Sequence, residues 1–457
     1  MSFELTTLGE YAVVQGGFAY KSQDFVSEPG IAVLKIKNIR HGCIDYALPS
    51  FVSDGTARSS AKWFTAPGDI LISMTGSGPS APESLVGRVA RVWEQEPRAL
   101  INQRVGRLRL KEGSEIDQDF LFYLLSQKEI QDFLVTNSTG SANQVNISSK
   151  TIEAVPCPRV GFVESQEIAN FLNVFEQRIR LLRETNATLE AIAQALFKSW
   201  FVDFDPVRAK LEGRAPEGMD EATAALFPDA FEESELGLVP SGWKVMPMGQ
   251  LCSVTIGGLW GKDEQDEVGL NQAISLRGVD LEHLRIYGFA EKAPVRWVKD
   301  SAMEKRRLNE TQVLIASSGA GPCGRPLWGG FAFEALYGIP VIFSNFVKRL
   351  DCETSGRAIF IDRMLANMRE TREIWNYING TSIPNLDDKL LLATKKVLLP
   401  SNEILSAFET ISRTFYEQLY SQQAQTLATL RDTLLPRLIS GQLRLPEVES
   451  LTEESVA

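Results

Sequence analysis

The residue types that most often carry catalysis are scarce in this chain of 457 residues. It has two histidines, His41 and His283, and five cysteines, none spaced as a CxxC pair. A zinc site or a histidine-based catalytic triad therefore has almost no residues to work with, and we expect reduced, mostly buried thiols. Asp203, Asp205 and Lys210 superficially resemble a nuclease carboxylate set. They lie beside a proline in a segment with no strand pattern, so we expect no metal site there.

Two motifs of enzymes that act on nucleic acids are also missing. The sequence contains no NPP-aromatic or DPP-aromatic tetrapeptide, the signature of an amino-methyltransferase. It contains no GxxxxGK[ST] phosphate loop either. We therefore expect neither methyl transfer nor ATP hydrolysis, and no bound cofactor, from this chain.

What the first part of the chain does offer is a set of hydrogen-bonding groups on glycine-bearing turns. Such groups suit DNA: backbone N–H groups and cations meet phosphates, amides pair with adenine and arginine with guanine. The alternatives are ordinary hairpin turns, a solvated strand face and structural hydrogen bonds within the loops. The candidates are Gly16, Gly17, Tyr20, Lys21, Lys35, Lys37, Asn38, Arg40, Ser73, Thr75, Gly76, Arg88, Asn102, Gln103, Arg104, Asn143 and Gln144. Lys35 and Lys37 are expected to share one face of a strand.

A corresponding set lies in the second part of the chain. Its candidates are Trp260, Lys262, Arg277, Ser317, Ser318 and Arg325. The basic run from Lys305 to Arg307 either meets phosphates or is a solvated face.

A long helix from Glu164 to Phe201 is expected to hold these turns in place. No glycine or proline occurs from Phe162 through Asp205, in a chain with 34 glycines and 21 prolines. Apolar residues recur in steps of four and three, which predicts a coiled-coil seam and requires a partner helix. The seam residues are Ile168, Leu172, Phe175, Ile179, Leu182, Leu189 and Leu196. Asn186 either fixes the register of this seam or is exposed where the seam drifts.

The stretch from Ser401 to Leu435 supplies the partner helix. Its expected seam includes Leu427, Leu430 and Leu434. The pattern shifts register near Phe415–Tyr416 and is rich in glutamine beyond that point. A partly polar pairing within one chain is therefore favoured over a homodimeric zipper.

The two parts of the chain are similar to each other at a spacing near 240 residues. FELTTLGEYAVVQGG at 3–17 matches WKVMPMGQLCSVTIGG at 243–258, and LKIKNI at 34–39 matches ISLRGV at 274–279. GDILISMTGSG at 68–78 matches TQVLIASSGAG at 311–321. In the helices, LEAIAQALF at 189–197 matches LATLRDTLL at 427–435. This tandem duplication predicts an internal pseudo-two-fold axis and antiparallel helices.

The expected architecture is an α+β fold with two pseudo-symmetric, strand-rich domains separated by two long helices packed as an antiparallel coiled coil. The boundaries are 1–160 and 242–400 for the domains, 161–205 and 401–440 for the helices, 206–241 for an acidic linker and 441–457 for an acidic tail. The net charge of −11 arises from residues 203–237 and the tail. The rest of the chain is neutral, so a DNA-binding surface is not excluded.

With these motifs in order, the chain resembles the specificity subunit of type I restriction-modification systems. The resemblance rests on SGWKVMPMGQL, GDILISMTGS, ALFKSWFVDFDPVRAKLEG and TLLPRLISGQLRL, and covers essentially the whole chain. It implies two target recognition domains, each reading one half of a bipartite double-stranded DNA site, and helices that set the spacer and dock two methyltransferase subunits. Restriction subunits complete such a nuclease. S-adenosylmethionine, ATP and magnesium belong to those partner subunits.

Two other readings remain open. One is a single-chain enzyme that combines recognition with methylation or cleavage, and the other is a scaffold or decoy that binds the methyltransferase but no DNA. The beginning, MSFELTTLGEY, lacks a signal-peptide pattern, and no apolar run reaches the roughly 18 residues of a membrane span. The cytoplasm is therefore the expected compartment.

Overall fold

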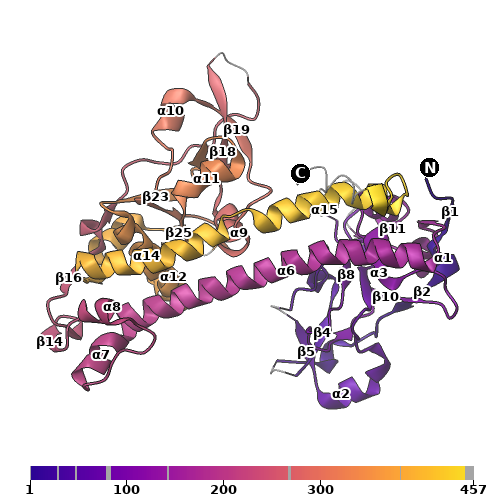
Figure 1. Cartoon of the computed structure of the whole chain (residues 1–457), viewed down its shortest axis with the longest axis horizontal. Helices are drawn as coiled ribbons and strands as arrows, with labels where there is room; N and C mark the ends of the chain where they lie inside the picture. Colours follow the sequence, from indigo (N-terminus) through magenta and orange to yellow (C-terminus); the bar gives the residue numbers. More distant parts are fainter. Residues whose placement is uncertain are drawn as a thin grey trace. The chain divides into compact units, whose positions relative to one another are not determined.

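The computed structural model describes residues 2–27, 30–46, 49–78, 84–141, 144–265, 269–380 and 382–447. The chain divides into two compact units. Unit 1 comprises Met1–Arg178 and Leu427–Ala457, and unit 2 comprises Ile179–Thr426. Each unit has mixed helix and strand content and contains part of the long helix α6 (Phe162–Lys198) (Figure 1). No described helix has the length and apolar character needed to cross a membrane.

The core of unit 1 is an antiparallel four-stranded sheet in the order β2-β10-β6-β8. The bounds are β2 Ala12–Gly16, β10 Val105–Leu110, β6 Ile70–Ser73 and β8 Val89–Arg91. The sequence, with short apolar stretches between glycine-bearing turns, predicts strands at Tyr11–Val14, Val105–Leu110, Ile70–Met74 and Gly87–Trp93, and the four strands lie at these places. All four residues of β6 are buried, so this central strand reads as a continuous apolar run rather than an alternating one.

Two further sheets and several helices complete unit 1. The second sheet has the order β3-β5-β4-β9, and the third β11-β12-β7. Their bounds are β3 Phe25–Val26, β5 Ser50–Val52, β4 Ile31–Leu34, β9 Leu100–Ile101, β11 Thr139–Ser141, β12 Gln144–Asn146 and β7 Thr75–Gly76. A terminal pair joins β1 Leu5–Thr7 to β13 Pro156–Pro158. The helices are α1 Leu8–Tyr11, α2 Asp54–Ser59, α3 Gln118–Leu125, α4 Lys128–Thr136 and α5 Ser149–Glu153.

Two local expectations for unit 1 are wrong. The apolar pattern of Asp119–Val135 predicts a single helix there. The structure breaks it between α3 and α4, where the Ser126 hydroxyl donates to the Phe122 carbonyl, 2.7 Å away, and Gln127 is extended. The strand expected to carry Lys35 and Lys37 on one face ends at Leu34. Residues 36–38 form a 3₁₀ turn instead, because the Asn38 side-chain oxygen accepts the Lys35 N–H at 2.9 Å.

Unit 2 repeats this plan. Its four-stranded antiparallel sheet has the order β17-β23-β20-β21, with β17 Cys252–Ser253, β23 Val347–Cys352, β20 Gln312–Ala316 and β21 Pro326–Trp328. A three-stranded sheet has the order β19-β18-β22, with β19 Val295–Lys299, β18 Leu270–Leu276 and β22 Val341–Phe343. Two further strand pairs join β16 Lys244–Pro247 to β26 Lys396–Leu399 and β24 Ile378–Asn379 to β25 Asn385–Leu386. The helices of the domain are α9 Gly278–Tyr287, α10 Asp300–Glu304, α11 Gly330–Tyr337, α12 Ser355–Glu370 and α13 Asp388–Thr394.

Two glycines show how closely the units correspond. A Cβ on Gly17 would lie 2.2 Å from the Asn102 carbonyl oxygen, and a Cβ on Gly258 would lie 1.9 Å from the Ser344 carbonyl oxygen. At both positions only glycine lets the two backbones approach. The duplication inferred from sequence therefore extends to matching backbone contacts.

One stretch of the inferred repeat is out of register. The Asn102 N–H donates to Leu34, and the matching Ser344 N–H donates to Leu276, both at 2.9 Å. LKIKNI at 34–39 therefore corresponds to a stretch beginning at Leu276, two residues later than the sequence match placed it. Both stretches are apolar-polar patterns in which a shift of two residues preserves the alternation, so sequence alone could not fix the register.

The sequence predicts that the acidic segment 206–241 is a linker with one short helix around Asp220–Leu226. The structure shows more regular structure in this segment than that. That helix is present as α8 Glu221–Ala225, and α7 Asp205–Leu211 precedes it. A hairpin, β14 Phe231–Ser234 with β15 Gly237–Pro240, follows. The segment folds because Val207 and Phe227 bury their side chains in the core of unit 2.

Helix α6 packs antiparallel to C-terminal helices within each unit. In unit 1, Ile168 and Leu172 join Leu435, Leu438 and Ile439 of α15 (Gln423–Ile439) in one apolar core. Ion pairs fix the direction, because Glu164 pairs with Arg444 and Glu176 with Arg431. In unit 2, Phe197, Trp200 and Phe201 pack their rings on Phe408 of α14 (Asn402–Leu419).

The buried seam of α6 drifts away from a strict heptad. Phe175, Leu189 and Leu196 are half-buried, whereas Glu176 and Phe197 are buried. A straight helix has 3.6 residues per turn, so a 3.5-residue repeat drifts by about 20° per heptad and passes the contact to the next residue. Asn186 stays on the seam and is buried, and its side-chain oxygen has no hydrogen-bond partner.

The second long helix is not continuous, contrary to expectation. It breaks between α14 and α15, where Gln422 adopts a left-handed conformation with φ of 61°. Tyr420 is buried in unit 2 and donates its hydroxyl to the Trp328 carbonyl at 2.9 Å, which stabilises the break. The seam of α15 also differs: Ala428 and Leu435 are buried, while Leu430 is 45% exposed and lies outside it.

A charged cluster anchors α6 to the domain of unit 2. The Glu190 carboxylate lies 2.9 Å from Arg285 of α9 and 2.8 Å from Arg363 of α12. Arg285 also pairs with the fully buried Asp362 at 3.0 Å. Burial acts to raise the pKa of Glu190, but the charges of Arg285 and Arg363 outweigh it and lower that pKa from 4.5 to about 2.

Lowering the pH is therefore expected to destabilise unit 2, because Glu190 becomes protonated and loses its charge. A depressed folded-state pKa contributes stability that is present above pH 4.5 and is lost as the pH falls towards 2, and the shift corresponds to about 3 kcal/mol. Urea unfolding of the wild type and of Glu190→Gln between pH 6 and pH 2.5 measures this loss of stability. We expect a shallower pH dependence for the variant, and parallel curves would contradict this role.

Candidate nucleic-acid interface

One end of the main sheet of unit 1 gathers most of the candidate residues. Gly16 ends β2 opposite Gly106, and Ser73 ends β6 opposite Val105. Arg88 precedes β8, and its carbonyl accepts the Ser73 N–H at 2.9 Å. Because the strands are antiparallel, these ends meet, and we call the region formed by Gly16–Gly17, Ser73–Gly76, Arg88 and Asn102–Arg104 the first sheet end.

The turn from Asn102 to Arg104 is held on several sides by backbone hydrogen bonds. The Gln103 N–H donates to Phe18 at 2.8 Å, and the Arg104 carbonyl accepts the Met74 N–H at 2.9 Å. The side chains of Gln103 and Arg104 are exposed. A fixed backbone thus presents an amide and a guanidinium, the two groups that best read adenine and guanine.

Arg104 is held by two neighbours. Its Nη1 lies 2.8 Å from the Asn146 side-chain oxygen and 3.4 Å from the Thr75 hydroxyl. The Thr75 hydroxyl donates to the same Asn146 oxygen at 2.8 Å. One edge of the guanidinium is engaged, so its orientation is set before a ligand arrives.

Asn146 was missed by the sequence reasoning, which selected Asn143 and Gln144. Asn143 lies outside the described residues. Gln144 is exposed and begins β12, the strand that Asn146 ends. The period of two along this strand puts positions 144 and 146 on one face and could have identified Asn146.

Several candidate side chains of unit 1 are buried. They form structural hydrogen bonds within the loops and are not placed to contact a ligand. Tyr20 donates its hydroxyl to Ser60 at 2.9 Å, and the Asn38 amide donates to the Asp45 carbonyl at 2.9 Å. Ser73 donates to the Ile36 carbonyl at 3.3 Å. Together with Thr75, these side chains hold the loops and do not present themselves to solvent.

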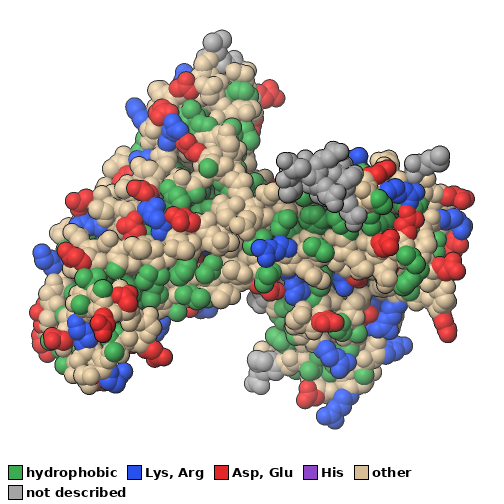
Figure 2. Space-filling model, viewed as in Figure 1, with side chains coloured by type: hydrophobic (Ala, Val, Ile, Leu, Met, Phe, Trp, Pro, Cys, Tyr) green, Lys and Arg blue, Asp and Glu red, His purple; other side chains and the backbone are tan. Residues whose placement is uncertain are grey.

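The candidate cations of unit 1 divide into exposed and internally engaged groups. Lys21 and Lys37 are exposed. Arg40 is also exposed but pairs with Asp45 at 2.9 Å. The Lys35 ammonium sits 3.8 Å from the centre of the Phe25 ring, and burial followed by repulsion from Lys37 lowers its pKa. In Figure 2, Lys and Arg side chains are interspersed with Asp and Glu on the displayed face.

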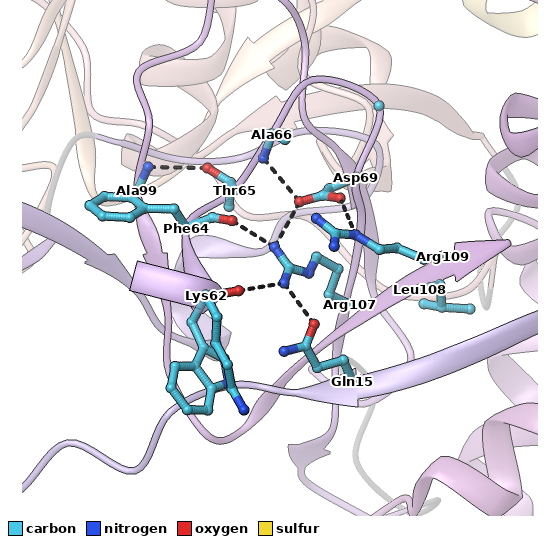
Figure 3. Close-up of polar contacts among 12 residues, drawn as sticks. Gln15, Lys62, Phe64, Thr65, Ala66, Asp69, Ala99, Arg107, Leu108 and Arg109 are labelled. Atoms are coloured by element: carbon cyan, nitrogen blue, oxygen red, sulfur yellow. Dashed lines mark hydrogen bonds and ion pairs between the residues drawn. The ribbon is translucent and has the colours of Figure 1, made fainter. Parts of the chain in front are cut away.

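A buried arginine braces the first sheet end. Arg107, which is 1% exposed, reaches from β10 to the carbonyl oxygens of Lys62 at 2.8 Å and Phe64 at 2.6 Å (Figure 3). It also contacts the Gln15 side-chain oxygen at 2.6 Å and the Asp69 carboxylate at 3.1 Å. These contacts tie a loop to the strand that ends at Gly16.

Unit 2 carries the same brace at the matching position of β23. Arg349 is buried and donates to the Lys305 carbonyl at 3.0 Å. It also pairs with Asp351 at 2.9 Å. Sequence reasoning selected neither arginine, although a charge inside an apolar strand such as VGRLRL signals a buried polar anchor.

The corresponding region of unit 2 is formed by Gly257–Gly258, Ala316–Ser318, Arg325 and Ser344–Phe346, which we call the second sheet end. Ala316 pairs with Val347 across the sheet, and the Ala316 N–H donates to the Arg325 carbonyl at 2.8 Å. Ser317 is buried, and Ser318 is half-buried and bridges to Asn385.

The remaining candidates of unit 2 have mixed environments. Lys262 is exposed, and the Trp260 ring stacks 4.1 Å from the Arg296 guanidinium. Arg277 pairs with Asp280 at 2.9 Å. Arg325 pairs with Glu282 in a groove of about 750 Å³ that is also lined by α6 residues. These two arginines are therefore engaged within the protein.

Other polar groups singled out from the sequence have internal partners. Arg306 donates to the Gly257 carbonyl at 2.8 Å, and Arg307 pairs with Glu304 at 3.0 Å, so the basic run is largely engaged. Asp203 pairs with Lys198. Within the described ranges, no group of three or more His, Cys, Asp or Glu residues is placed to hold a metal ion.

Comparison with known proteins places this arrangement in context. Residues 2–191 match the family described as type I restriction modification DNA specificity domain. The MjaIX specificity subunit of Methanocaldococcus jannaschii is 26% identical over 76% of this chain and 73% of its own length. The HindI specificity subunit of Haemophilus influenzae is 23% identical over 71% of this chain and 77% of its own length.

A solved structure supports the same fold. The S subunit of a type I restriction-modification system from M. genitalium matches with a TM-score of 0.52 and 16% identity, covering 96% of both chains. That likeness concerns the fold alone. Residues 2–191 thus match the type I restriction modification DNA specificity domain, the chain is similar in sequence to type I restriction enzyme specificity subunits, and its fold is similar to that of a solved S subunit.

Proposed function

We propose that this chain is the non-catalytic DNA-recognition subunit of a type I restriction-modification complex. Each unit reads one half of a bipartite double-stranded site through its sheet end, and the long helices set the spacer. The observation that carries the proposal is the duplication of a braced sheet end. Arg107 and Arg349 hold matching loops in two units of one chain. Two similar but non-identical readers fit a site with two different halves.

The partners follow from the same proposal. Two methyltransferase subunits dock on the helices and bring S-adenosylmethionine, and restriction subunits bring ATP and magnesium. An exposed apolar stripe on α6 supports docking. Val163, Val174, Leu181 and Ile192 are between 48% and 66% exposed. At 100° per residue, the steps of 11, 7 and 11 return to the same side of the helix.

Charge on this stripe is expected to block assembly. Val174→Glu combined with Leu181→Glu should reduce capture of the methyltransferase by at least ten-fold, because two apolar side chains would be replaced by charges that are costly to desolvate. Co-purification with the methyltransferase subunits measures the effect. The matched control changes Leu236 and Leu238 to glutamate, since both are exposed on the hairpin after α8. If the stripe variant captures the methyltransferase as well as the wild type does, α6 is not part of the docking surface.

DNA recognition itself is tested by co-expressing the chain with its methyltransferase subunits. We expect salt-sensitive, sequence-specific binding in a gel shift and methylation only when all subunits are present. Methylation by the chain alone would favour a single-chain enzyme. Capture of the methyltransferase without any DNA binding would favour a scaffold or decoy.

A further inference from the structure

The turn Ser344–Val347 of unit 2 occupies the place that Asn102–Val105 occupies in unit 1. The Val105 N–H closes the first turn on Asn102 at 2.8 Å, and the Val347 N–H closes the second on Ser344 at 3.0 Å. Both turns are preceded by a strand that pairs in parallel with its neighbour, β9 with β4 and β22 with β18. Corresponding positions in these turns can therefore be compared one by one.

The third position of each turn differs in chemistry. The carbonyl of Arg104 accepts the Met74 N–H at 2.9 Å, and the carbonyl of Phe346 accepts the Ser317 N–H at 2.8 Å. The same backbone thus presents a guanidinium in unit 1 and a phenyl ring in unit 2. Phe346 was not selected from the sequence, because none of the matched sequence blocks contains this turn.

The Phe346 ring is displayed by a rigid base. It is 59% exposed, while its neighbours Ser344 and Val347 are fully buried. Leaving this apolar ring exposed to water forgoes the stabilisation that the fold would gain by burying it. Since the flanking residues are locked in the core, the ring cannot be withdrawn without displacing the strand.

A second apolar side chain lies on the segment beside this turn. Ile383 is 63% exposed, and it precedes β25. The Leu386 N–H of β25 donates to the Ser317 carbonyl at 2.9 Å, while the Ser317 N–H bonds to Phe346. Ser317 therefore joins two segments that each expose an apolar group. In unit 1 the Ile147 N–H donates to the Met74 carbonyl at 2.9 Å in the same way, so Ile383 corresponds to Gln144. The matching positions of unit 1 therefore hold the polar residues Arg104 and Gln144, both exposed.

We propose that Phe346 is a specificity-determining residue that packs on the C5-methyl group of a thymine in the half-site read by unit 2. Arg104, at the matching position of unit 1, donates to a guanine in the other half-site. The inference rests on the proposed function and adds the base class that each unit prefers. Thymine is distinguished from the other bases in the major groove by this methyl group, and arginine pairs with guanine O6 and N7.

The test uses the complex of the full chain with its methyltransferase subunits and synthetic DNA that carries the site which the complex methylates. Each thymine of the two half-sites is replaced in turn by uracil, which removes only the methyl group. We expect one substitution in one half-site to weaken wild-type binding about ten-fold and to have no effect on Phe346→Ala. Phe346→Leu, which keeps an apolar side chain, should restore part of the sensitivity.

Matched variants separate this inference from the proposed function. Leu238→Ala removes an equally exposed apolar group from the hairpin after α8 and should leave the uracil profile unchanged. Arg104→Ala should weaken the preference of the complex for a guanine in the opposite half-site. A wild-type complex that binds no specific site would overturn the proposed function itself. A complex that binds its site but is indifferent to uracil at every thymine, or a Phe346→Ala variant that keeps the full uracil sensitivity, would overturn the role of Phe346 alone.

Discussion

Replacing Arg107 by methionine is expected to lower the free energy of unfolding of unit 1 by about 3–5 kcal/mol. The guanidinium is buried and neutralises the buried carboxylate of Asp69, 3.1 Å away. Removing it leaves that carboxylate without its buried partner, and the carbonyls of Lys62 and Phe64 and the Gln15 amide also lose their donor. Buried polar groups without partners are costly because water cannot replace the lost bonds.

Hydrogen exchange in the full-length chain, read by mass spectrometry, measures this loss in the peptides that contain β6 and β10. Arg109→Met is the matched control. Arg109 contacts the same Asp69 carboxylate at 3.2 Å, but its own side chain is 51% exposed, so its loss should cost less than about 1 kcal/mol. Equal protection in the two variants would show that the Arg107 contacts do not stabilise the first sheet end.

Deleting the heptad Gln177–Arg183 from α6 is expected to change the spacer of the target and to leave both half-sites readable. Seven residues of helix correspond to about 10 Å, or roughly three base pairs of DNA. Removal of seven residues turns the helix by only about 20°, so the seam nearly keeps its face. The residues that we propose to contact DNA lie outside the deleted segment.

The spacer is read from the methylated motif in cells that carry the complex. Where the single deletion prevents assembly, a second variant also removes Gln423–Thr429 from the antiparallel helix α15. Deletion of seven residues from the acidic segment, Glu212–Gly218, is the matched control and should leave the spacer unchanged. An active complex with a shortened α6 and the original spacer would refute the role of the helix in setting the distance.

The large features of the fold were predictable because they depend on patterns that extend over many residues. The uninterrupted stretch around Ile168–Trp200 predicted α6, and the repeat of several blocks at one spacing predicted two similar units. Short apolar stretches separated by glycine-bearing turns likewise predicted the central strands, including β10. These signals are sums over long windows, in which single exceptions cancel.

The exceptions arise from single contacts that no window reveals. The break at Gln422 depends on the burial of Tyr420 and its bond to the Trp328 carbonyl. The 3₁₀ turn after Leu34 depends on one bond from the Lys35 backbone to Asn38. Local side-chain bonds of this kind compete with regular structure and are decided by tertiary packing.

The candidate site was predictable as a region and less so residue by residue. Turns at the ends of neighbouring strands were selected as a group because glycines and polar residues mark them, and the structure brings several of these turns together at the first sheet end. Burial then divides the group: Tyr20 and Ser73 face inward, and Arg104 faces outward. Phe346 escaped notice because an exposed aromatic carries no signal in sequence until its matching position in the other unit is known.

The most direct test of the central claim is sequencing of the methylated bases in the genome of a host that expresses this chain with its methyltransferase subunits. The proposed function predicts one bipartite motif, two different specified half-sites separated by a fixed run of unspecified bases, and loss of all such methylation without the chain. A single continuous motif, or methylation that persists when this chain is deleted, would contradict it.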